Sequence, residues 1–107
     1  MQERWLPCKI QLKTRGGKPR RAYLVLLDAF GVLEPRAGVV LLVRHPSGAT
    51  FQIPGRVSRR LSRGYVEIYI PADAGLTLAA QMGITPEKST TVYGYAAQIK
   101  SINPPPP

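Results

Sequence analysis

The sequence predicts a single domain that is mainly β, folded as a small β-barrel with one or two short helices. Three observations lead to this fold class. Apolar and polar residues alternate, or apolar residues run continuously, over lengths typical of strands. Eleven prolines and ten glycines divide the chain into many short elements. The length of 107 residues suffices for one hydrophobic core, so we expect one domain over residues 1–102 and a disordered, proline-rich tail over residues 103–107.

The first half of the chain predicts a meander of four strands. "CKIQLKT" alternates strictly and indicates a half-buried strand with a basic outer face. Its apolar face carries Cys8, Ile10, Leu12 and Thr14. A turn over "RGGKPRR" leads to "RAYLVLLDA", which is apolar on both faces and is therefore expected in the centre of a sheet. "VVLLVRH" is a second continuous apolar strand, and the turn "HPSG" leads to a fourth strand, "ATFQI".

The next segment, "IPGRVSRRLSRG", predicts a short helix with an arginine face. Its arginines follow the helical spacing i, i+3, i+4 and i+7, at Arg56, Arg59, Arg60 and Arg63. Pro54 is suited to open such a helix and Gly64 to end it. A helix of about two turns is marginal alone, so it would dock through Val57 and Leu61. The alternative is an irregular basic loop. Because the segment contains no acid before Glu67, we expect its arginines to be unpaired within the chain.

The second half predicts two more strands around another helix. "YVEIYIP" alternates, with Val66, Ile68 and Ile70 on one face and tyrosines and Glu67 on the other. "ADAGLTLAAQMG", residues 72–83, predicts a helix that ends at Gly83. "TTVYGYAAQIK" predicts a last strand with one face made of Tyr93, Tyr95, Ala97 and Ile99.

The net charge of +9 is concentrated in one part of the chain. Residues 1–63 hold thirteen Lys/Arg and three Asp/Glu, a net of +10, whereas residues 64–107 hold two and three, a net of −1. Arginine outnumbers lysine ten to five, and arginine suits phosphates and base edges better than lysine. The asymmetry favours a polyanionic partner, nucleic acid before a membrane surface. The alternative is that the basic residues only solubilise the surface.

Compartment and chemistry follow from what the sequence lacks. The longest apolar run, "AGVVLLV", is too short for a membrane span, and "MQERWLPCK" carries no secretion signal, so we expect a cytoplasmic protein with no membrane partner. No spacing of Cys and His indicates zinc, and no glycine-rich loop indicates a nucleotide. We expect no enzyme and no cofactor. His45 is expected in a turn, and Cys8 is expected to pack as a small apolar residue.

Candidate nucleic-acid-binding residues are the basic side chains at the two predicted turn or helix segments, together with one arginine beside His45. They are Arg15, Lys18, Arg20, Arg21, Arg44, Arg56, Arg59, Arg60 and Arg63. Tyr65 and Tyr69 are candidates for stacking on unpaired bases, and Tyr93 and Tyr95 could add to that surface. The alternative is that these tyrosines cover a sheet face.

One stretch resembles a known family. "SGATFQIPGRVSRRL" is similar to the start of AbrB/SpoVT-type swapped-hairpin domains, in which a strand ends in Ile-Pro and a brief helix follows. The matching positions are Gly48, Ile53, Pro54, Val57 and Leu61. "YIPADAGLTLAAQMGI" resembles a looser second copy, so the resemblance spans residues 47–99. It implies a cradle-loop barrel, a homodimer, and DNA contacts from Arg56, Arg59, Arg60 and Arg44.

These observations lead to three hypotheses about function. The first is a duplex-DNA-binding homodimer, a transcriptional regulator or antitoxin, with DNA favoured over RNA. The second is an OB-like or SH3-like barrel that binds single-stranded DNA or RNA, with Tyr65 and Tyr69 stacking on bases. The third is a non-enzymatic protein-interaction or assembly module, viral or part of a larger complex, whose basic patch contacts an acidic protein partner.

Overall fold

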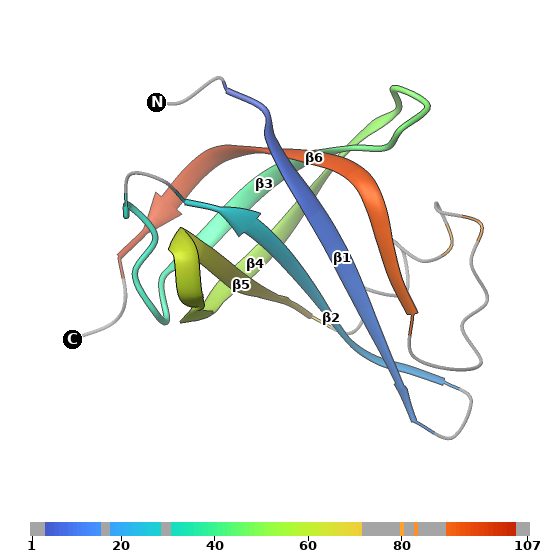
Figure 1. The fold of residues 1–107 in the computed structure, drawn as a ribbon, viewed down its shortest axis with the longest axis horizontal. Coiled ribbons are helices and arrows are strands. Elements are labelled where there is room, and N and C mark those ends of the chain that lie inside the picture. The colour runs from blue at the N-terminus through green and yellow to red at the C-terminus, as the bar shows by residue number, and fades with distance from the viewer. Residues whose placement is uncertain are drawn as a thin grey trace.

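The computed structural model describes residues 4–15, 18–28, 31–71, 80, 83 and 90–104, without the side chains of residues 14, 15 and 18–20. Within these ranges the strands close into an antiparallel β-barrel in the order β1-β2-β5-β4-β3-β6 (Figure 1). Their bounds are Leu6–Arg15 (β1), Lys18–Leu27 (β2), Gly38–Arg44 (β3), Thr50–Arg60 (β4), Tyr65–Ile70 (β5) and Thr90–Asn103 (β6). The prediction of a small, mainly β barrel is confirmed.

The order of the strands is that of a Greek key. β3, β4 and β5 pair consecutively, and β6 returns to lie beside β3. β2 pairs with β1 and β5, so the predicted meander of the first four strands is wrong. The connection from Asp28 to β3 is too long for a tight hairpin, and its residues Leu33 and Ala37 are buried in the core. The chain therefore crosses one end of the barrel between β2 and β3.

The alternating strands place their apolar residues inside the barrel. Cys8, Ile10 and Leu12 of β1 are buried, as are Val66, Ile68 and Ile70 of β5. β3 contributes its alternate residues to the same core, at Val39, Leu41 and Val43. The inward faces of β1 and β5 are as predicted from the sequence, apart from Thr14, whose side chain lies outside the described part of the structure. The outward faces of all six strands form the outer wall of the barrel.

The predicted arginine-faced helix over residues 56–63 is wrong, because β4 continues through Pro54 to Arg60. Pro54 lies opposite Val40 of β3, and the pairing of β4 with β5 begins only at Arg56. The missing proline N–H therefore interrupts no β4–β5 pairing. A Cβ on Gly55 would lie 2.7 Å from Ile68 Cγ2, so the glycine lets β4 approach β5 closely. Pairing on both sides outweighs the helical spacing, and only the turn Ser62–Gly64 (η1) is helical here.

Two other expectations concern the end of the chain. The predicted helix over residues 72–83 lies outside the described residues, apart from Ala80 and Gly83. The last strand extends beyond its predicted end, since Asn103 still pairs with Gly38 of β3. The proline-rich tail therefore begins one residue later than expected, and residues 105–107 lie outside the described ranges.

Strand β6 is long and bent, and it closes the barrel by pairing first with β1 and then with β3 (Figure 1). Its register with β1 shifts between the pairs Cys8–Tyr95 and Ile10–Val92, which leaves one extra residue in β6. This bulge contains Gly94 at a φ of +85°. The expected common face of Tyr93, Tyr95, Ala97 and Ile99 is therefore broken, because Tyr93 is 70% exposed whereas the other three are buried.

Candidate nucleic-acid interface

The outward side chains of β1, β2, β5 and β4 form aligned rows across the barrel wall. One row runs from Lys9 through Val25 and Glu67 to Arg59. The next row runs from Gln11 through Tyr23 and Tyr69 to Arg56. Beyond it, Lys13 lies directly opposite Arg21. We call this surface the outer basic face, defined by Lys9, Gln11, Lys13, Arg21, Tyr23, Val25, Glu67, Tyr69, Arg56 and Arg59.

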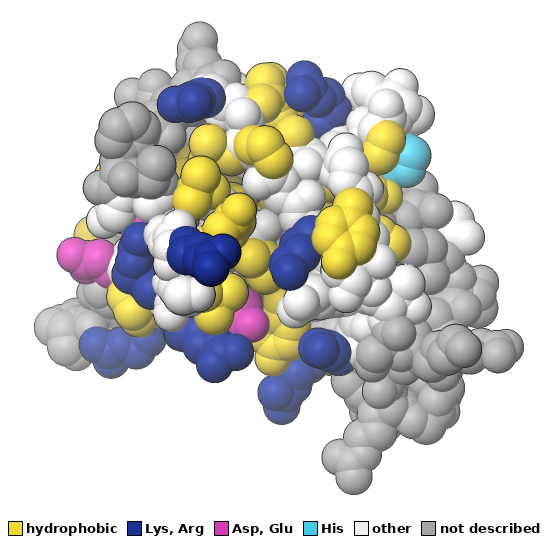
Figure 2. Space-filling view, in the orientation of Figure 1, with side chains coloured by type: hydrophobic (Ala, Val, Ile, Leu, Met, Phe, Trp, Pro, Cys, Tyr) yellow, Lys and Arg dark blue, Asp and Glu magenta, His cyan; other side chains and the backbone are white. Residues whose placement is uncertain are grey.

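The outer basic face is hollowed by a polar depression of about 460 Å³. Lys9, Lys13 and Arg59 line it, with Tyr23 and Glu67 between them. Figure 2 shows the side of the barrel that β1 crosses, where dark-blue cationic side chains surround yellow apolar ones. Among the described residues of the outer basic face, five are cations and Glu67 is the one acid. The surface therefore carries an excess of positive charge around a concave centre.

Tyrosines lie among these cations. The rings of Tyr23 and Tyr69 lie 5.8 Å apart between centroids, tilted by 59°. A side-chain hydrogen bond with Tyr23 raises the pKa of Arg21, whose side chain is exposed. Both residues are half-buried, so part of each remains accessible to solvent. Tyr69 was predicted as a stacking residue, and it does lie on the cationic surface.

Two arginines of β4 reach the outer basic face with partners of their own. Arg59 Nε lies 3.4 Å from Glu67 Oε1, but its side chain remains 67% exposed. Arg56 Nη1 donates to the backbone carbonyl of Arg36 at 3.0 Å. The Arg56 hydrogen bond is at the surface, and the Arg59 side chain is mostly exposed although Glu67 is not. Both guanidinium groups therefore remain accessible to an anion.

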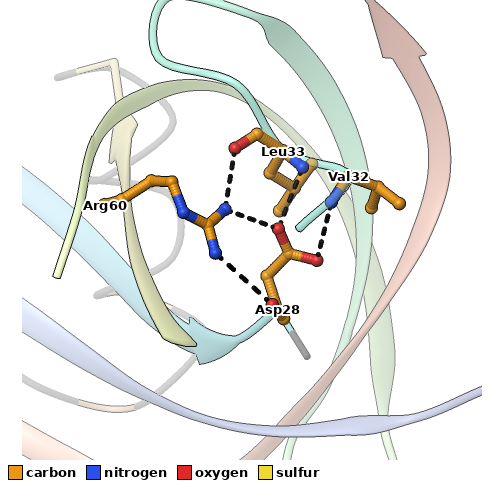
Figure 3. Close-up of polar contacts among 4 residues, drawn as sticks. All are labelled: Asp28, Val32, Leu33 and Arg60. Carbon is orange, nitrogen blue, oxygen red and sulfur yellow. Dashed lines mark hydrogen bonds and ion pairs between the residues drawn. The ribbon is translucent and has the colours of Figure 1, made fainter. Parts of the chain in front are cut away.

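Arg60 points the other way, into the end of the barrel (Figure 3). Its Nη1 donates to Asp28 Oδ2 at 2.8 Å and to the Leu33 carbonyl at 3.1 Å. The Asp28 carboxylate also accepts the backbone N–H groups of Val32 and Leu33, at 3.2 and 2.9 Å. The Asp28 side chain is 3% exposed. The pair therefore fastens the β2–β3 connection across the barrel end.

A β-bulge explains why adjacent arginines face opposite ways. Val57 pairs with Ile68 and Arg59 with Glu67, so Ser58 is an extra residue in β4. Without it, alternation from the buried Val57 would turn Arg59 inward and Arg60 outward. The expectation that these arginines are unpaired is wrong for Arg59 and Arg60. The fold brings their partners close: Glu67 lies on the neighbouring strand β5, and Asp28 directly follows β2.

The environment of Asp28 has opposing effects on its pKa. Burial alone would raise it, but the hydrogen bonds from Arg60, Leu33 and Val32 and the charge of Arg60 lower it below its ordinary value. The carboxylate is therefore ionised at neutral pH. Arg60, which was a candidate for binding nucleic acid, has an internal structural partner.

The remaining candidates lie away from the outer basic face or beyond the described side chains. The Arg44 guanidinium lies 4.4 Å from the centroid of the Trp5 ring. Arg63 is exposed in the turn Ser62–Gly64, at a φ of +62°. The side chains of the other three candidates, Arg15, Lys18 and Arg20, lie outside the described part of the structure.

A second depression, of about 700 Å³ and mostly apolar, adjoins the first. The two share Lys9, Val25 and Leu61. Tyr65, the other predicted stacking residue, lines this second depression together with Tyr93. We call it the apolar depression and the first one the cationic depression.

Sequence reasoning missed three of the cationic and aromatic residues of the outer basic face. Lys9 and Lys13 lie on the predicted basic outer face of the first strand but are not among the predicted binding residues. Tyr23 was read as part of a strand with two apolar faces. The alternation of "CKIQLKT" was the signal for the lysines, whereas the placing of Tyr23 beside Tyr69 needed the β2–β5 pairing.

Two other expectations about single residues are confirmed. His45 lies in a turn, where its Nδ1 accepts the backbone N–H of Ser47 at 3.0 Å. Cys8 is buried, and burial raises its pKa to about 12.

Within the described ranges, no three His, Cys, Asp or Glu side chains lie close enough to hold a metal ion. No helix in the described part of the chain has the length and apolar character needed to cross a membrane. Comparisons with protein-family models, curated proteins and solved structures found no match for this chain.

Proposed function

We propose that the protein binds single-stranded nucleic acid along the outer basic face. The observation that carries this proposal is the alignment of cations and tyrosines in adjacent rows of one concave wall. A cationic groove that follows phosphates, with aromatic rings for the bases, is the usual design of surfaces that bind single strands. The strands hold these groups on a rigid barrel, so little order has to be gained on binding.

The placing of Lys13 opposite Arg21 supports an anionic partner. Like charges directly opposite on neighbouring strands destabilise a sheet. A phosphate between them would remove that repulsion and gain two charge-assisted hydrogen bonds. Lys9 and Arg59 line the cationic depression and extend the positive charge along the wall. Cations in such a groove are suited to contact the phosphates of a single strand.

The shape of the site favours a single strand over a duplex. Base edges of a duplex are read inside its major groove, by a protruding helix or β-ribbon. The arginine segment on which the duplex hypothesis rested is part of the barrel wall rather than a helix. The barrel is closed by strands of one chain, so it needs no strand from a partner. Homodimerisation and the AbrB-like resemblance stay predictions.

Binding of fluorescent oligonucleotides across a salt series tests the proposal. We expect single-stranded DNA or RNA to bind more tightly than duplex DNA at about 50 mM salt, with an affinity that falls steeply as salt rises. Lys9→Ala/Lys13→Ala should reduce the slope of log K against log salt by about 1.4, since each phosphate contact on a single strand contributes about 0.7.

The matched control is Arg4→Ala/Lys100→Ala, which removes the same charge from exposed positions that line neither depression. It should leave the slope unchanged. Equal slopes for the two double variants would contradict the proposed site. Preferential binding of duplex DNA would favour the regulator hypothesis, and no binding to any nucleic acid would favour an acidic protein partner.

A further inference from the structure

The apolar depression begins where the cationic depression ends. Lys9 stands at the boundary, because it lines both, and Val25 and Leu61 do the same. On the far side of this boundary the lining changes to Leu27, Tyr65 and Tyr93. A chain that crosses the boundary therefore leaves a charged surface and enters an aromatic and aliphatic one.

Tyr93 faces solvent because of the bulge at Gly94. Regular alternation from the buried Tyr95 would turn Tyr93 into the barrel, but the extra residue turns it outward. The positive φ of Gly94 is a conformation that glycine adopts without the steric cost of a side chain. Bulges of this kind re-aim side chains and are frequent beside binding sites.

Two further exposed apolar side chains stand near Tyr93. Leu27 and Tyr65 pair across β2 and β5, and they are 37% and 43% exposed. Cys8 and Tyr95, which are buried, also line the depression. Since burial holds the Cys8 thiol in its neutral form, this buried part of the lining carries no charge at neutral pH. The depression therefore offers rings and methyl groups to a flat, uncharged group.

We propose that the apolar depression is a base-binding subsite, in which one unpaired base stacks against Tyr93 while its neighbouring phosphate lies at Lys9. The inference rests on the proposed function and adds to it the recognition of a base. A volume of about 700 Å³ is within the range of pockets that hold small ligands. Stacking on tyrosine needs no particular base, because every base has a π-face. Such a subsite lets the protein bind a strand that carries bases more tightly than a polyanion without bases.

The test compares an oligonucleotide of about twelve thymidines with an abasic strand of the same length and charge. We expect the parent protein to bind the base-bearing strand about tenfold more tightly. Tyr93→Ala should reduce this ratio several-fold and leave the affinity for the abasic strand unchanged. Tyr93→Phe keeps the ring and should keep the ratio.

The control for loss of an exposed apolar side chain is Ile102→Ala, which lies outside the depression and should change neither affinity. If the parent bound both strands equally, or if Tyr93→Ala weakened both equally, the base subsite would be refuted while the proposed function stood. If the parent bound neither strand, both proposals would fall.

Discussion

Arg59 and Arg60 are neighbours in β4, yet they occupy opposite environments. Arg59 lies on the outer basic face, largely exposed and 3.4 Å from Glu67. Arg60 enters the barrel end, where it contacts the buried Asp28 and two backbone carbonyls. The bulge at Ser58 makes this difference. Positive charge in a sequence therefore has two uses in this fold: to fasten a connection inside the barrel, or to present cations to a partner.

The largest expected effect comes from removing the Arg60–Asp28 ion pair at the barrel end. Arg60→Ala leaves the Asp28 carboxylate buried without its counter-charge, so we expect a loss of about 3 kcal/mol in the free energy of unfolding. Arg59→Ala should cost less than about 1 kcal/mol, because the Arg59 side chain is 67% exposed and solvent screens its pair with Glu67. Urea denaturation of the two variants measures both values. Similar losses of stability for the two variants would contradict the inference that Arg59 and Arg60 occupy different environments.

Acid should weaken the internal pair selectively. The pKa of Asp28 is lowered in the folded protein, so its stabilisation is complete above the unfolded pKa of about 3.9 and is lost as the pH falls through the folded pKa. We therefore expect the parent protein to lose stability selectively as the pH falls below about 3.9. Asp28→Asn cannot ionise and should lack this loss. If Asp28→Asn had the same dependence of stability on pH as the parent, Asp28 would not be the source of the acid sensitivity.

The second bulge, at Gly94, should tolerate substitution less well than a turn glycine of similar backbone conformation. Gly94→Ala places a side chain at a φ of +85° and brings its Cβ to 3.3 Å from Pro46 Cγ, so we expect a loss of about 1 to 2 kcal/mol. Gly48→Ala has a φ of +98° and nothing within 4 Å. Thermal unfolding should show the smaller loss for Gly48→Ala; the reverse order would mean that the Pro46 contact is accommodated.

The smallest expected effect is on the salt dependence of binding, and it tests whether Arg59 contacts a phosphate. Its replacement by alanine should reduce the salt slope for single-stranded DNA by about 0.7, the contribution of one phosphate contact. Arg60→Ala, measured at a temperature where it is fully folded, should leave the slope unchanged. Fluorescence anisotropy over a salt series gives both slopes. If only Arg60→Ala reduced the slope, Arg60 rather than Arg59 would make the phosphate contact.

Local patterns predicted the strands well where burial alternates along one segment. β1 and β5 follow their sequence alternation without interruption on the core side, at Cys8, Ile10 and Leu12 and at Val66, Ile68 and Ile70. The pairing of β2 with β5 could not be predicted in this way, because it depends on a connection that crosses the barrel and buries Leu33. Alternation shows which residues face inward but does not say which strand lies alongside.

The arginine segment shows the opposite case, in which a local pattern was misleading. The spacing of Arg56, Arg59, Arg60 and Arg63 matches a helix, and Pro54 is compatible with a helix start. The same residues are also compatible with a bulged strand, because one extra residue reverses the facing of those beyond it. Pairing with β3 and β5 decides between them. The bulge and the partners Asp28 and Glu67 depend on tertiary structure. A local sequence pattern could therefore not predict which arginines face outward and which face the barrel end.

Strand β6 lies late in the chain and closes the barrel against both β1 and β3. Until Thr90–Asn103 is available, β1 and β3 each keep an unpaired edge, and exposed edges promote pairing with other chains. Closure also joins residues separated by most of the sequence, such as Leu6 and Ala97. Contacts of such long range slow folding. The barrel that presents a rigid face when complete is therefore most open to aggregation just before its last strand is added.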